Sequence, residues 1–194
     1  MLLLPAGGIL SPMSMKRILL PRPAAGEYAP YYEKYIALVP GNDILRFLEE
    51  QLVLFTRLFA GRGERDGEFR YAPGKWTVKE ALGHVNDTER IFAYRALRMA
   101  RGDKTPLAGF EQDDYVRNGG FAQRRLAELA EEFTHVRRAS VVLFRGFDEA
   151  AWLRRGTASQ NEVSVRALAY MIAGHAQHHA KLFEEQYFPA IPRA

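Results

Sequence analysis

The sequence predicts an all-α protein whose helices form a four-helix bundle. Four stretches carry apolar residues at alternating spacings of three and four positions, the pattern of a helix with one buried face. Between them there is no convincing run that alternates apolar and polar residues, so no strand is expected. The 194 residues are enough for one core and one domain. We therefore expect four amphipathic helices packed together, with an irregular N-terminal arm and long inter-helix loops.

The first helix is expected over residues 43–60. Its apolar face consists of Leu45, Leu48, Leu52, Phe55 and Phe59. Three glycines follow within seven positions, which ends the helix and indicates a loop. The segment before this helix, residues 26–43, is aromatic and interrupted by two prolines. We expect it to be irregular and to pack on the outside of the core.

The second helix is expected over residues 77–102. It opens with Thr77 and Glu80 three positions apart, which is a capping box in which each side chain bonds the backbone N–H of the other residue. Its apolar face consists of Ala81, Val85, Thr88, Phe92, Ala96 and Met99, widened by His84 and Ile91.

The third helix is expected over residues 121–145 and the fourth over residues 164–187. Ser164 is a good N-cap for the fourth helix, and Pro189 follows its end. The third helix buries Leu126, Leu129, Phe133, Val136, Ser140 and Leu143. The fourth buries Val165, Leu168, Ile172, His175, His179 and Leu182. The connections at 102–120 and 146–163 are long for a bundle, and such loops often shape a binding site.

Composition excludes several classes of protein. The chain has no cysteine, so it has neither disulfides nor thiolate metal sites nor a protein thiol nucleophile, which is typical of a cytoplasmic protein. No apolar run approaches the length of a membrane span, so we expect no membrane partner. The net charge of +4 is modest. The densest basic spots are short doublets, among them Arg137–Arg138, which we interpret as solvated surface and not as a specific nucleic-acid face.

We divide the chain into an N-terminal arm, residues 1–26, and a helical domain, residues 27–194. The arm begins with a short apolar run that is too short for a membrane span and lacks the basic start of a signal peptide. Met13 and Met15 offer alternative starts. We therefore interpret the arm as a disordered extension or as an over-extended gene start.

Three of the five histidines lie within the stretch GHAQHHAKL of the fourth helix. Because residues on a helix step by about 100°, His175 and His179 lie about 40° apart and both continue the apolar face. His178 lies about 100° away from His179, so it is a residue of the pocket rim or an exposed one. Buried imidazoles in an apolar core need partners. The pair is therefore either hydrogen-bonded within the core or bound to a shared metal ion.

His84 favours the metal, because it lies on the inward face of the second helix. Three histidines on two facing helices give the ligand number of a catalytic metal site that keeps an open position. Imidazole ligands suit zinc, nickel, copper or iron. We therefore predict a divalent ion on His84, His175 and His179. The fifth histidine, His135, lies off the apolar face of the third helix, and we expect it at the surface.

Three sequence motifs resemble those of the DinB-like superfamily, which includes the YfiT-type metal-dependent hydrolases. They are Trp76-Thr77-Val78-Lys79-Glu80, Gly83-His84-Val85-Asn86-Asp87-Thr88-Glu89 and Gly174-His175-Ala176-Gln177-His178-His179. The resemblance covers residues 27–189. It implies a four-helix bundle, a homodimer and a divalent metal on three histidines, which match His84, His175 and His179 by position. Among divalent metals, we expect zinc or nickel first, then iron or manganese.

The predicted site supports two reaction types on a small-molecule substrate. An ion with an open position can bind water and lower its pKa to about 7, which would support hydrolysis. It can also bind a thiolate, and relatives in the superfamily use bacillithiol or mycothiol, so transfer with a low-molecular-weight thiol stays open. The alternative from another class is a non-enzymatic metal-binding or stress-response bundle.

No clear general base stands out in the sequence. Asp87, one turn from His84, is a weak candidate for orienting a ligand histidine, and a solvated residue is the competing interpretation. Glu80 is assigned to the helix cap. Asp113, Asp114 and Tyr115 lie in a long loop, where they either line a pocket or serve as turn residues. Trp76 is expected to be a packing anchor.

Overall fold

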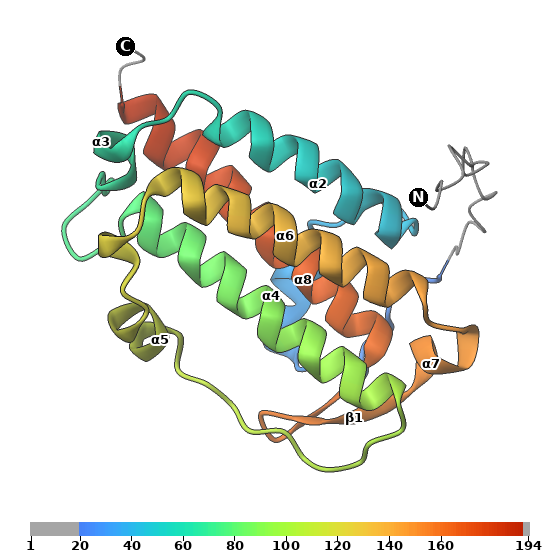
Figure 1. Cartoon of the computed structure of the whole chain (residues 1–194). Helices are drawn as coiled ribbons and strands as arrows, with labels where there is room; N and C mark the ends of the chain where they lie inside the picture. The colour runs from blue at the N-terminus through green and yellow to red at the C-terminus, as the bar shows by residue number, and fades with distance from the viewer. Residues whose placement is uncertain (1–19, 192–194) are drawn as a thin grey trace, which may run out of the picture.

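The computed structural model describes residues 20–191, and its four long helices form the predicted bundle (Figure 1). They are α2 (Ile44–Phe59), α4 (Val78–Ala100), α6 (Leu126–Arg145) and α8 (Val165–Leu182). α4 packs on α6 and α8, and α2 also packs on both, so the four close into a ring around the core. The fold class and the four helical stretches are therefore confirmed.

The helices α4 and α6 point the same way, because their connection returns along the length of the bundle (Figure 1). This return explains why the loop predicted at 102–120 is so long. Part of it is helical, as α5 (Gln112–Asn118), and a 3-10 turn, Phe121–Gln123, follows. Arg124 is then extended, with ψ 152°, so the third long helix starts at Leu126, five residues later than predicted.

A small hairpin departs from the expectation of no strand. β1 (Arg155–Ala158) pairs antiparallel with β2 (Asn161–Ser164) through a turn at Ser159 and Gln160. Both turn residues have positive φ, 50° and 63°, a conformation that usually selects Asn or Gly. The hairpin was missed because its strands have four residues each and its turn lacks the usual residues.

Further short helices lie around the bundle. They are α1 (Glu33–Ile36) with the 3-10 turn Pro30–Tyr32 before it, α3 (Glu64–Gly67), α7 (Glu149–Leu153) and the 3-10 turn Phe188–Ala190. The fourth long helix stops being α-helical at Leu182 and continues as a π-helical turn, Phe183–Tyr187. The predicted extent of that helix thus covers both conformations.

The helix α8 is the centre of the core. It is enclosed by α2, α4 and the short α1, so most of its residues are buried, small ones such as Ala169 and Ala173 included. The closest approach is at Gly174, where a Cβ atom would lie 2.0 Å from the carbonyl oxygen of Tyr35. A glycine at 174 therefore lets α1 lie directly on α8.

The basic doublet Arg137–Arg138 does not lie wholly at the surface, contrary to the prediction. Arg138 is exposed, but Arg137 is completely buried between helices. Its guanidinium forms an ion pair with Glu89, with Nη2 to Oε2 at 2.8 Å, and Nη1 donates to Gln51 Oε1 at 2.6 Å. The sequence placed Arg137 outside because arginine is rarely buried without a partner, and that partner lies 48 positions away on α4.

Residues 20–26 lie against the domain. Leu20 is buried in the core, and Arg22 donates hydrogen bonds to the carbonyl oxygens of Ile36 and Val39. The expectations for the alternative starts at Met13 and Met15 fall outside the described residues. The division into an arm and a domain stays a prediction.

Glu27 ties the N-terminal segment to the start of α8. Its carboxylate accepts hydrogen bonds from Ser164 Oγ at 2.7 Å, Arg166 Nε at 2.7 Å and the backbone N–H of Ala24 at 3.0 Å. Burial alone would raise the pKa of Glu27, but the hydrogen bonds from Arg166, Ala24 and Ser164 outweigh it and lower the pKa to about 2.

We expect Glu27 to stabilise the fold only above acidic pH. A carboxyl whose pKa falls from 4.5 unfolded to about 2 folded contributes fully above pH 4.5 and loses its contribution as the pH drops toward 2. The free energy of unfolding of Glu27→Gln should therefore be about 3 kcal/mol lower than that of wild type at pH 7 and equal near pH 2. Urea titrations across this range measure the difference. Glu162→Gln, in an exposed ion pair with Arg155, is the control and should show no such trend.

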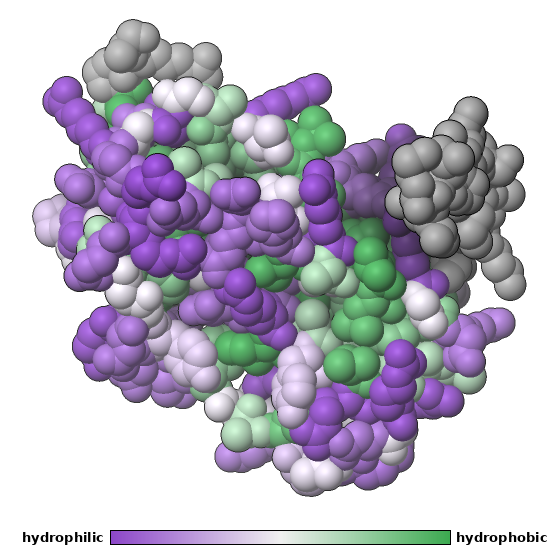
Figure 2. Space-filling view, viewed as in Figure 1, coloured by the Kyte–Doolittle hydropathy of each residue, from purple (hydrophilic) through white to green (hydrophobic). Residues whose placement is uncertain are grey.

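The face of the molecule in Figure 2 is mostly hydrophilic, with apolar residues gathered over the C-terminal half of α6. Val142 lies on that helix with 67% of its surface exposed. Within residues 20–191, no helix combines the length and the apolar character needed to cross a bilayer.

Candidate metal centre

Three histidines meet where α4 packs against α8. His84 comes from α4, and His175 and His179 come from successive turns of α8. The Nε2 atoms of His84 and His175 are 3.0 Å apart, and one nitrogen from each of the three rings lies within 4.8 Å of the others. The structure thus brings together the three residues that the apolar faces selected.

All three imidazoles are buried, with exposed fractions of 4% to 6%. Burial lowers the pKa of His84 to about 4, and the nearby His178 contributes to the shift. Burial and mutual repulsion hold the pKa values of His175 and His179 well below their ordinary range. At neutral pH the rings are therefore uncharged, and each has a nitrogen lone pair to offer.

Aromatic rings surround the cluster. The indole of Trp76 lies 4.7 Å from the His84 ring, and the Tyr35 ring lies 5.5 Å from that of His175. Tyr35 reaches this position because α1 crosses α8 at Gly174, next to His175. Trp76 is half-buried, as expected of a packing anchor, and it also forms a wall of the cluster. Tyr35 was not among the predicted site residues, because its only signal in the sequence is the aromatic run that contains it.

The other two histidines have different surroundings. His178 is half-buried and stands beside the cluster, with its ring 5.4 Å from that of Tyr35. Its position is that of a rim residue, and burial followed by the charges of Lys34 and Lys181 lowers its pKa. His135 is exposed on α6 beside Glu131, as predicted.

The acidic candidates interact with groups other than the histidines. Asp87 is 3.6 Å from Arg90, and its pKa is raised by burial while the charges around it are those of Arg90, Glu132 and Arg124. Glu80 accepts from the backbone N–H of Thr77 at 2.7 Å, so the capping box is confirmed.

The long-loop candidates Asp113, Asp114 and Tyr115 are exposed on α5. Thr88, which the sequence assigned only to the apolar face, is the polar neighbour of His84, with its Oγ1 3.5 Å from Nδ1.

A buried polar network supports α8 beside the cluster. Gln51, held by Arg137, donates through Nε2 to the carbonyl oxygen of Ala173 at 2.9 Å and to Gln177 Oε1 at 3.2 Å. Ala173 and Gln177 each precede a cluster histidine by two positions. The network therefore fixes the position of α8 along its axis relative to α2 and α6.

The sequence pattern of a known protein superfamily matches residues 48–183 of this chain. The matched region is more than half of the chain and includes all three cluster histidines. The chain belongs to the DinB superfamily. No curated protein matches it by sequence.

Two solved structures have the same fold as this DinB superfamily chain. One is YfiT from Bacillus subtilis, described as a probable metal-dependent hydrolase with an unusual four-helix bundle topology. The two sequences are 14% identical, and the structures superpose with a TM-score of 0.66. The match covers 84% of this chain and 90% of YfiT. The other is a mycothiol-dependent maleylpyruvate isomerase, 16% identical, with a TM-score of 0.63. That match covers 81% of this chain and 66% of the isomerase, so the chain spans just under two thirds of that protein.

The cluster of His84, His175 and His179 offers three nitrogen ligands, as divalent metal sites in proteins do. Bonds of about 2.1 Å to a tetrahedral ion place ligand nitrogens about 3.4 Å apart, and the distance between His84 Nε2 and His175 Nε2 is 3.0 Å. The Nδ1 atom of His179 is buried with no hydrogen-bond partner among the described residues. Three uncharged imidazoles without a carboxylate partner are costly in a core unless something binds them. The residues therefore fit a metal ion.

Proposed function

We propose that this protein is a metal-dependent enzyme that acts on a small molecule, with a divalent ion held by His84, His175 and His179. The observation that carries the proposal is the convergence of three buried, uncharged imidazoles from two helices. Within residues 20–191, no fourth His, Cys, Asp or Glu joins this group, so an ion bound here would keep a position for a substrate. Zinc and nickel are the first candidates, then iron and manganese.

The proposed reaction is hydrolysis, or transfer that involves a low-molecular-weight thiol. A bound ion would supply Lewis-acid polarisation at its open position. YfiT supports hydrolysis by its description, and the mycothiol-dependent isomerase supports thiol chemistry. The chain's own residues would shape the site. Trp76 and Tyr35 exclude water from two sides, and Thr88 faces the second nitrogen of His84 and orients its ring.

Two further expectations belong to the same proposal. We infer a homodimer from the family resemblance and from the apolar surface around Val142, and light scattering on the purified protein would test it. We infer a cytoplasmic location from the lack of cysteine in the sequence.

Replacing His84 by alanine should abolish stoichiometric metal binding. Removing one of three ligands should weaken the affinity by more than the roughly 10- to 100-fold that loss of a supporting residue costs. The measurement is elemental analysis of tag-free protein after loading with zinc or nickel and gel filtration. His135→Ala removes an exposed imidazole and is the matched control, which should bind like wild type. Wild-type protein that stays metal-free, or His84→Ala that loads fully, would contradict the proposed centre.

Activity assays separate an enzyme from a non-enzymatic metal-binding bundle. Metal-loaded wild type is tested on ester and amide substrates, and on electrophiles with bacillithiol or mycothiol. Turnover that requires the metal and is lost in His84→Ala supports the enzyme. A large drop in melting temperature on chelation, with no turnover of any of these compounds, would favour a structural metal in a non-enzymatic bundle.

A further inference from the structure

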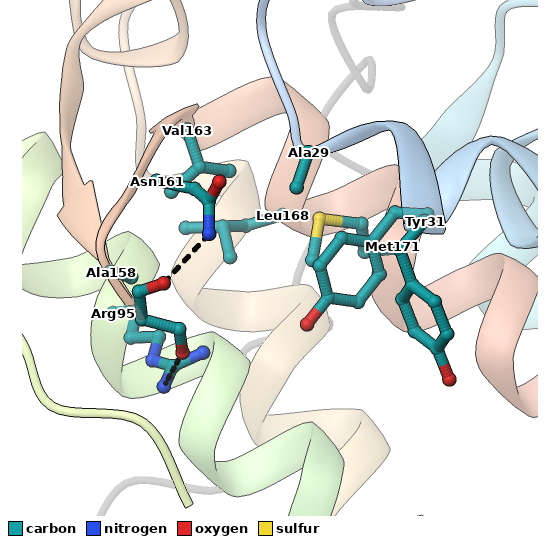
Figure 3. Close-up of a pocket in the computed structure, with 10 residues that line it drawn as sticks. Ala29, Tyr31, Arg95, Ala158, Asn161, Val163, Leu168 and Met171 are labelled. Atoms are coloured by element: carbon teal, nitrogen blue, oxygen red, sulfur yellow. Dashed lines mark hydrogen bonds between the residues drawn. The ribbon is translucent and has the colours of Figure 1, made fainter.

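A cavity of about 200 Å³ lies between α4, α8, the hairpin and the segment that precedes α1 (Figure 3). Leu168 and Met171 of α8 form its back, Arg95 of α4 lies on one side, and Tyr31 lies on the other. The hairpin contributes Asn161. This volume is below the ~300–1,000 Å³ of sites for drug-sized ligands, so the cavity suits a smaller molecule.

The charge in this cavity is Arg95, whose exposed fraction is only 4%. Its Nη2 atom donates to the carbonyl oxygen of Ala108 at 2.7 Å and to Ser159 Oγ at 3.1 Å. Within residues 20–191, no carboxylate pairs with it, and its Nε and Nη1 atoms form no hydrogen bond. A buried cation without a counter-ion is unfavourable, and Arg95 retains donors for an anion.

The partner of Arg95 is held in a strained conformation. Ser159 has a φ of 50° and Gln160 a φ of 63°, a region that costs most residues about 1–2 kcal/mol. Two contacts fix this turn. The backbone N–H of Ser159 donates to the carbonyl oxygen of Leu107 at 3.0 Å, and Asn161 Nδ2 donates to the carbonyl oxygen of Ser159 at 2.7 Å. The turn thus holds the Ser159 hydroxyl, and with it the guanidinium, at the cavity.

We propose that this cavity binds a small organic acid, with its carboxylate on Arg95 and its apolar part against Leu168 and Met171. One arginine balances the single charge of a carboxylate, whereas phosphate would bring a further charge into a cavity with apolar walls. Tyr32 also lines the cavity, where burial raises its pKa and the charge of the nearby Arg95 opposes part of that rise.

The acid site is separate from the histidine cluster. Arg95 and His84 are 11 residues apart on α4, which is about 16 Å along the helix axis. None of the three histidines lines the cavity, and Met171 at its back is one helical turn from His175 on α8. Binding of the acid therefore goes beyond the proposed metal chemistry and does not depend on it.

The test compares benzoate with benzamide, its uncharged counterpart of the same shape. Binding is followed by NMR from the backbone amide signals of Ser159 and Asn161, with a chelator present so that benzoate on a metal does not contribute. Benzoate should bind saturably, and benzamide about tenfold more weakly or less, because it cannot form a charge-assisted hydrogen bond with Arg95. This comparison on wild type needs no variant to fold.

Variants locate the binding. Arg95→Met should reduce benzoate binding about tenfold or more, and Arg95→Lys should restore part of it. Arg46→Met removes the same charge from an exposed position on α2 and should bind like wild type. The proposal is overturned by equal binding of benzamide, by unchanged binding to Arg95→Met, by inorganic phosphate binding more tightly than benzoate, or by no saturable shift with benzoate, butyrate or acetate.

Discussion

Replacing Gly174 by alanine is expected to lower the free energy of unfolding by about 3 kcal/mol or more, at the upper end of what overpacking costs. The new Cβ would lie 2.0 Å from the carbonyl oxygen and 2.4 Å from the carbonyl carbon of Tyr35. Both are backbone atoms, which cannot turn aside as a side chain does. The segment α1 would have to move away from α8 and would take the Tyr35 ring away from His175.

Urea denaturation measures this loss, and metal titration of the folded fraction measures the effect on the cluster. Gly63→Ala is the matched control, because a Cβ there meets nothing within 4 Å and the backbone φ of −106° suits alanine. Because Gly63 is the N-cap of α3, where alanine is slightly less favourable than glycine, the change should cost less than about 1 kcal/mol. If Gly174→Ala unfolds at the same urea concentration as Gly63→Ala, the close approach of α1 to α8 is wrong.

Breaking the buried ion pair is the second large effect. Glu89→Leu should cost about 3–5 kcal/mol, because Arg137 would remain charged and enclosed without its counter-ion. The double variant Glu89→Leu with Arg137→Met should recover much of this loss, since two apolar side chains of similar size replace the pair. A double-mutant cycle on unfolding free energies measures the coupling.

An exposed ion pair provides the comparison for this cycle. Arg46 and Glu50 are 2.7 Å apart on α2, with more than half of each side chain exposed, so Glu50→Ala should cost no more than about 1 kcal/mol. A loss of the same small size for Glu89→Leu would contradict the enclosed position of Arg137. Metal affinity is a second measurement on Glu89→Leu. If Arg137 shifts in this variant, Gln51 loses its support and α8 moves, which should weaken metal binding at His175 and His179.

Features that depend on local chemistry could be predicted from the sequence. The apolar faces located four helices, Thr77 and Glu80 marked the start of α4, and Ser164 marked that of α8. The same periodicity separated His175 and His179 from His178, because the direction of a side chain on a helix follows from its position in the sequence. Whether the three histidines bind a metal stays a prediction that the loading experiment tests.

The features that were missed depend on distant partners. Arg137 is buried because Glu89 and Gln51 meet it from two other helices, and no local pattern reports such a meeting. Tyr35 reaches the cluster only because Gly174 admits the backbone of α1. The hairpin and the 3-10 turn before α6 are too short for periodicity to detect.

The central position of α8 also sets the order in which this protein can mature. The helix follows α1, α2, α4 and α6 along the chain, yet it contacts α1, α2 and α4 directly, and the bond from Gln51 to Ala173 joins residues 122 positions apart. Such distant contacts slow folding, because the intervening chain must be ordered before they form. On the ribosome, α2, α4 and α6 emerge while the groove for α8 is still empty. The three-histidine cluster therefore cannot form until translation has passed residue 179. Until then the apolar faces of the nascent helices need protection from aggregation.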